Sequence, residues 1–298
     1  MQLMNKLLTT FTLCTGIVLM ISSCGTEEEK KPEISKEVTD PNSSLNAKFD
    51  DKIFSIPSPM QMALLLEESK SPYNEYLLND LNKVDDYTSE YKKALNLGIY
   101  GTDLGYVSIY KQNSTALKYL STIEKLTSKL GLEGAFDKDF MSRFEKNSTN
   151  KDSMMVIVSD AFKKSDNFLK SNNRKSVSAL ILVGGWIESM YIACNINKEH
   201  SNEKILDRIA EQTETLKTII ALLTDYNKKG DWDELIKDMK DLKFYFDQIS
   251  IQYEYLAPVT NAKTKTTTLR HKTVVTIDTN VENFINQKIE MIRSKVTE

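Results

Sequence analysis

Glu188 is the residue best placed for acid–base chemistry, because it interrupts a long apolar stretch. Residues 177–187 are nearly all apolar, and Met190 follows within two positions. A carboxylate on a buried helix loses hydration, which raises its pKa unless a partner compensates. Tyr191 and Asn195 lie on the same side of such a helix. We interpret Glu188 as a buried carboxylate with one structural partner; a ligand-binding or catalytic role, with Tyr191 and Asn195 beside it, stays open.

A second set of polar residues falls in "NLGIYGTDLGY", residues 96–106. If this stretch is helical, Asn96, Tyr100 and Asp103 share one side of the helix. As a functional interpretation, they form a polar and aromatic strip that binds a ligand. The lysines on the same side favour a solvated face instead; they are Lys92, Lys93 and Lys111.

The glycines of that stretch do not match a phosphate-binding loop. "GIYGTDLG" fits neither the dinucleotide fingerprint nor the Walker loop, and no strand–helix–strand pattern surrounds it. On a helix, the small residues share one face, which consists of Ala94, Gly98, Gly101 and Gly105. The apolar helix predicted at residues 174–196 has a face of the same kind, made of Ser178, Gly185, Ser189 and Ala193. We therefore predict that these two helices pack closely.

Other kinds of chemistry find few suitable residues. The only histidines are His200 and His271, so neither a histidine triad nor a multi-histidine metal site is predicted. Cys194, on the apolar helix, is typical of a small core residue rather than a nucleophile. The net charge of −3 is spread along the chain, which is not the pattern of a nucleic-acid-binding protein. We expect no metal, no cofactor and no nucleic-acid partner.

The elements that must position these residues are helices. Residues 51–298 are predicted to form a single all-α domain, a multi-helix bundle around the central apolar helix, with a subdivision near residues 197–203 left open. Two apolar stripes, at residues 205–226 and 235–256, predict a C-terminal antiparallel helical hairpin. Residues 260–278 are the only stretch with strand character, either as an exposed loop or as a small β-hairpin.

The first 24 residues indicate where the protein goes. Leu7–Ile21 is an uncharged apolar run, too short for a comfortable membrane span and typical of a signal peptide, here residues 1–23. The sequence "ISSC", which ends at Cys24, resembles a bacterial lipobox. That resemblance implies that Cys24 becomes the mature N-terminus and carries lipid chains that anchor the protein in a membrane.

Residues 24–50 are predicted to form a lipidated, disordered acidic tether, because they are rich in charge and poor in large apolar side chains. The acidic run Glu27–Glu29 resembles the export signal of surface lipoproteins in Bacteroidota-type bacteria. We expect an outer-membrane lipoprotein. Whether the domain faces the periplasm or the cell surface stays open.

The chain as a whole resembles a family of uncharacterised all-helical lipoproteins of Bacteroidota-type bacteria. The resemblance rests on "SSCG", "IPSPMQMALLLEESKSPYNEYLLN", "KALNLGIYGTDLGY", "RFEKNSTNKDS" and "GGWIESMY". It covers most of residues 53–197 and implies the compartment and a helical domain. It implies no activity, so no functional residue can be transferred.

Two classes of function stay open. The preferred one is a cell-envelope lipoprotein whose helical domain binds a partner protein or a small ligand without catalysis. The alternative is an envelope enzyme that uses Glu188 and Asp103 as acid and base. Two carboxyl groups that converge in a concave pocket would favour the enzyme, and an exposed apolar surface would favour the binding protein.

The first prediction concerns Cys24. We expect the mature protein to begin at Cys24 with lipid chains on it, and mass spectrometry of the N-terminal peptide from membranes measures this directly. The control is Cys24→Ser, which should release the protein from the membrane. An unmodified Cys24 in the membrane-bound protein would contradict the prediction.

Overall fold

The computed structural model describes residues 45–49, 52–56, 59–132, 138–147 and 150–298. All of them belong to one compact unit, Ile34–Glu298. The predicted signal peptide, Cys24 and most of the predicted tether lie outside the described residues. Strand β1 begins at Leu45, so regular structure starts before residue 51, where we expected the domain to begin.

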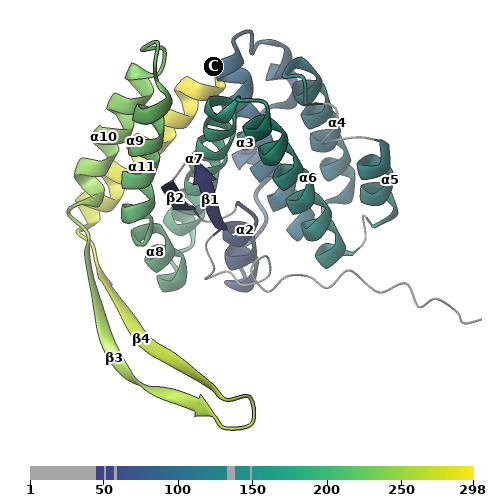
Figure 1. Cartoon of the computed structure of the whole chain (residues 1–298). Helices are drawn as coiled ribbons and strands as arrows, with labels where there is room; N and C mark the ends of the chain where they lie inside the picture. The colour runs from purple at the N-terminus through teal and green to yellow at the C-terminus, as the bar shows by residue number, and fades with distance from the viewer. Residues whose placement is uncertain (1–44, 50–51, 57–58, 133–137, 148–149) are drawn as a thin grey trace, which may run out of the picture. The chain divides into compact units, whose positions relative to one another are not determined.

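The described residues are mainly helical, which confirms the predicted all-α class (Figure 1). The α-helices are α2 (Pro59–Glu68), α3 (Glu90–Ile109), α4 (Asn113–Lys129), α5 (Lys138–Lys146), α6 (Lys151–Ser171), α7 (Lys175–Glu199), α8 (Glu203–Ala210), α9 (Gln212–Tyr226), α10 (Asp233–Phe246) and α11 (Thr279–Thr297). Two short 3₁₀ helices, η1 (Glu75–Leu77) and η2 (Leu81–Asp85), precede α3.

Helices α7 and α3 form the centre of the bundle (Figure 1). By length and composition α7 is the one helix of the described residues that could cross a membrane, but 89% of its apolar window is buried among the other helices. Helix α3 is buried at every position from Ala94 to Ile109. Because α7 is apolar and enclosed, it is the central helix that the sequence predicts.

Small residues bring these two helices into close contact. A Cβ atom at Gly98 would lie 1.9 Å from the Ile181 carbonyl oxygen, and one at Gly184 would lie 2.0 Å from the Leu95 carbonyl oxygen. The predicted glycine face is therefore correct for Gly98. It is wrong for Gly101, which instead faces the ring of Phe162 on α6, because successive turns of α3 meet different helices.

The predicted C-terminal helical hairpin is present as α9 and α10, but its second helix ends earlier than the predicted apolar stripe. Helix α10 ends at Phe246, and strand β3 begins at Ser250. Residues 249, 253 and 256 fit a helical spacing, whereas Ile251, Tyr253 and Tyr255 equally fit the alternation of a strand. The β-branched and aromatic side chains favour the strand, so the helical interpretation of Tyr253 and Leu256 is wrong.

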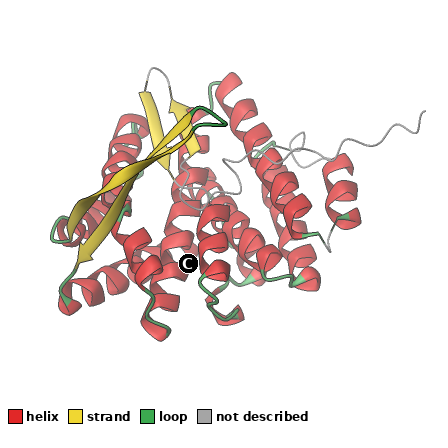
Figure 2. Cartoon of the chain, turned by 90° about the horizontal axis from the view of Figure 1, so that it is seen from below, coloured by secondary structure: helices red, strands yellow, loops and turns green. Residues whose placement is uncertain are grey.

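Two antiparallel β-hairpins accompany the helices. The first pairs β1 (Leu45–Phe49) with β2 (Lys52–Ile56), and the Phe49 ring packs against Tyr226. The second pairs β3 (Ser250–Asn261) with β4 (Thr266–Thr276), with a bulge between Leu256 and Val259. Figures 1 and 2 show β3 and β4 as a long ribbon that runs out from the ends of α10 and α11. Residues 250–276 are called the arm below.

Gly98→Ala tests the close packing of α3 on α7. The added methyl meets backbone atoms that cannot move aside, so we expect a loss of about 3 kcal/mol and a melting temperature lower by roughly 6–12 °C. Gly101→Ala is the matched control, because its methyl meets the end of the Phe162 side chain, which can shift. Equal losses in the two variants would contradict this account.

Candidate functional site

The candidate site centres on an ion pair between Glu188 of α7 and Arg293 of α11. The Arg293 Nε and Nη2 atoms each donate a hydrogen bond of 3.0 Å to one carboxylate oxygen of Glu188. The Glu188 side chain is fully buried, and that of Arg293 is 15% exposed. Bidentate geometry is the strongest form of this pairing. The structural partner expected for Glu188 is therefore Arg293.

Asp103 of α3 lies beside this pair and is also fully buried. Its Oδ2 atom accepts a hydrogen bond of 3.1 Å from the Asn79 amide, and Oδ1 accepts none among the described residues. Burial, followed by the negative charge of Glu188, raises the pKa of Asp103 well above its usual value. The raised pKa favours the neutral form of Asp103, which does not repel the Glu188 carboxylate.

Tyr191 and Asn195 follow Glu188 along α7, but their roles differ. The Arg293 guanidinium lies 4.4 Å from the centre of the Tyr191 ring, a cation–π contact that supports the buried cation. The Asn195 side chain donates a hydrogen bond to the Tyr191 carbonyl oxygen, within its own helix. The structure therefore joins Tyr191 to the cluster and leaves Asn195 outside it.

Asn96 and Tyr100 tie α3 to other elements. Asn96 donates a hydrogen bond of 2.9 Å to the Val296 carbonyl oxygen of α11, and Tyr100 donates one of 2.7 Å to the Asp80 carbonyl oxygen. Both side chains are buried. The interpretation of this strip as a solvated face was wrong: Lys92 and Lys93 lie in the first turn of the helix, Lys111 lies beyond its end, and its middle is covered on all sides.

Sequence analysis missed Arg293, Asn79 and Tyr119. The backbone amide of Asn79 donates the hydrogen bond to Asp103, and the Tyr119 hydroxyl donates one to the Asn79 carbonyl oxygen. One pattern could have found Arg293: it lies one helical turn after Ile289 and two turns after Ile285, on the buried stripe of α11. A charged residue on an apolar stripe needs a buried partner.

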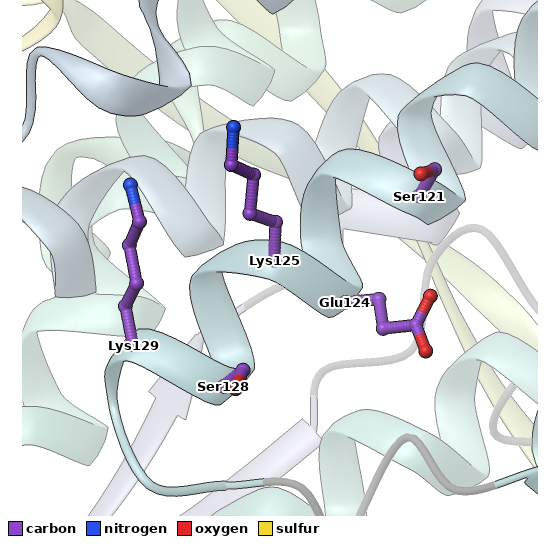
Figure 3. A pocket seen from close by; sticks show the side chains of 5 residues that line it. All are labelled: Ser121, Glu124, Lys125, Ser128 and Lys129. Carbon is purple, nitrogen blue, oxygen red and sulfur yellow. The ribbon is translucent and has the colours of Figure 1, made fainter.

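The carboxyl groups of Glu188 and Asp103 converge, and neither of two surface hollows, along α4 and α11, is lined by them. One hollow is lined by residues of α4 alone, and Figure 3 shows Lys125 and Lys129 on one side of that helix with Glu124 on another. The other lies along α11, around Met291 and Lys295. The described residues include no cluster of histidine, cysteine and carboxylate side chains fit to hold a metal ion. The arrangement places an ion pair and a third carboxyl group inside the bundle.

Comparison with protein-family models, with curated proteins and with solved structures found no match. The function must therefore be argued from the geometry of this chain. The resemblance to helical lipoproteins stays a prediction.

Arg293→Met tests the ion pair. It leaves Glu188 buried without a counter-charge, so we expect a loss of about 3–5 kcal/mol in the free energy of unfolding. Glu188→Leu combined with Arg293→Met removes both charges and should recover part of that loss. Urea unfolding of wild type, both single variants and the double variant measures the coupling. Additive losses would show that the two side chains do not stabilise each other.

Asp103→Asn tests the raised pKa of Asp103. Asparagine can accept the Asn79 hydrogen bond and carries no charge at any pH. Wild-type Asp103 takes up a proton on folding between its ordinary pKa of 3.8 and its raised pKa in the folded state, so its contribution to stability falls as pH rises through that range. We expect the melting temperature of Asp103→Asn, relative to wild type, to be higher at pH 8 than at pH 5. An unchanged difference would contradict the raised pKa.

Proposed function

We propose that this protein is an envelope lipoprotein, anchored through Cys24, that binds a partner protein through its arm and catalyses no reaction. The observation that carries the proposal is the exposure of large apolar side chains along β3 and β4. Folded proteins rarely leave such a surface uncovered unless it contacts something else.

The arm exposes several large apolar side chains. Tyr255 is 78% exposed and Leu269 is 81% exposed. Tyr253, Leu256 and Val259 are exposed as well. Tyrosine is enriched at protein interfaces, because its ring supplies contact area and its hydroxyl finds hydrogen bonds. The arm therefore has the composition of a protein-binding surface.

The two competing interpretations lack a comparable observation. An enzyme that used Glu188 and Asp103 would need a cavity at these carboxyl groups, and the described hollows lie elsewhere. The same argument applies to a small ligand held by Tyr191 or Asn96. The buried cluster supports a structural role, and among the described residues the arm carries half of the large apolar side chains that are exposed.

Photo-crosslinking in cells tests the proposal. We expect p-benzoylphenylalanine in place of Tyr255 to form an adduct with another envelope protein. The matched control is the same substitution at Tyr76, another exposed tyrosine, 88% exposed on the helical body. Adducts that are absent at position 255, or equally abundant at both positions, would overturn the proposal.

A further inference from the structure

The arm differs from the rest of the chain in charge. Residues 250–276 contain four cationic side chains, Lys263, Lys265, Arg270 and Lys272, and the single acid Glu254, whereas the whole chain has a net charge of −3. Arg270 and Lys272 are two positions apart on β4 and therefore project from the same face of the ribbon. The arm is a basic element on an acidic protein.

The two charges of β4 are weakly compensated. Lys272 lies 4.0 Å from Glu254, and both side chains are more than half exposed. Arg270 donates hydrogen bonds of 3.1 and 2.9 Å to the Ala257 carbonyl oxygen, which is a neutral acceptor. A carboxylate from another molecule can approach both cations, because exposed pairs of this kind hold little free energy.

The outer edges of the two strands are unequal. Among the described residues neither edge pairs with a further strand. The edge of β3 is interrupted by the bulge between Leu256 and Val259, and Pro258 within it has no amide hydrogen to donate. Strand β4 contains no proline and is rich in threonine and valine, the residues that favour strands. Its edge is therefore the better template for a third strand.

We propose that the β4 edge binds an extended, acidic segment of a partner protein, which adds to the arm as a third strand with acidic side chains facing Arg270 and Lys272. This inference rests on the proposed function and deepens it. A two-stranded hairpin is only marginally stable in water. A third strand satisfies the open backbone groups of β4, and its acidic side chains supply the missing counter-charges.

Two other occupants fit less well. In a second copy paired antiparallel about position 271, Arg270 would lie opposite Lys272 and like charges would repel. A lipid surface would attract the lysines, but hydrocarbon cannot satisfy the backbone groups of an open strand edge. An acidic polypeptide satisfies both the charges and the backbone.

The experiment places p-benzoylphenylalanine at Leu269 of the full-length protein in cells and combines it with charge reversal. Arg270→Glu with Lys272→Glu should lower the yield of the protein adduct about tenfold, since two attractive cross-strand pairs become repulsive. The matched control, Lys263→Glu with Lys265→Glu, makes the same change of charge in the turn outside the strands. It should leave the yield within about twofold of wild type, because it alters no cross-strand pair.

The identity of the adduct completes the test. Mass spectrometry of the crosslinked partner peptide should show acidic residues at alternate positions. Changing these acidic residues of the partner to lysine should restore its binding to the variant that carries both Arg270→Glu and Lys272→Glu. A protein adduct that survives this charge reversal would overturn the β4 inference while the proposed function stands. Equal losses in both charge variants, a lipid adduct, or an adduct of two copies of this chain would overturn it as well. The absence of any protein adduct at positions 255 and 269 would overturn both.

Discussion

The buried ion pair between Glu188 and Arg293 is the constraint on which the rest of the structure depends. Taking two charges out of water costs several kcal/mol for each ion, and only precise geometry and further hydrogen bonds offset that cost. Here the bidentate contact and the Tyr191 ring supply the compensation together. Because the pair joins α7 to α11 beside Asp103 of α3, it fixes the register of the C-terminal helix on the centre of the bundle.

That register also fixes the base of the arm. Strand β3 follows α10 and strand β4 leads into α11, so the orientation of the arm depends on how these two helices are held. Helix α11 is bound to α7 by the ion pair, and Lys295 joins it to Glu234 and Asp238 of α10 at 2.8 Å each. The buried ion pair thus acts on the arm indirectly, because it holds the helix from which β4 extends.

Hydrophobic periodicity made part of this structure predictable and left the rest open. The apolar run of α7 and the stripe of α9 follow from sequence alone, because each has one dominant pattern. Helix α3 is covered on every side, and its sequence has no polar face to set against an apolar one. The polar side chains of Asn96, Tyr100 and Asp103 were therefore interpreted as facing solvent. The partner of Glu188 lies 105 positions away along the chain, and a local sequence pattern cannot identify a contact between residues so far apart. At β3 the same residues fitted both the helical period and the alternation of a strand, and their β-propensity favours the strand.

The marginal stability of the arm bears directly on how it would bind. Most described side chains of the arm are exposed, and only Ile251, Thr273, Val274 and Val275 are partly buried. The ribbon therefore buries little apolar area, and its strands contribute little to the free energy of folding. Opening of the ribbon therefore costs less than opening of the bundle. A third strand that binds the closed ribbon stabilises it by mass action, and the affinity is reduced by whatever fraction of the arm is open. Because Arg270 already donates two hydrogen bonds to the Ala257 carbonyl oxygen, a carboxylate of the bound strand must compete with this neutral acceptor.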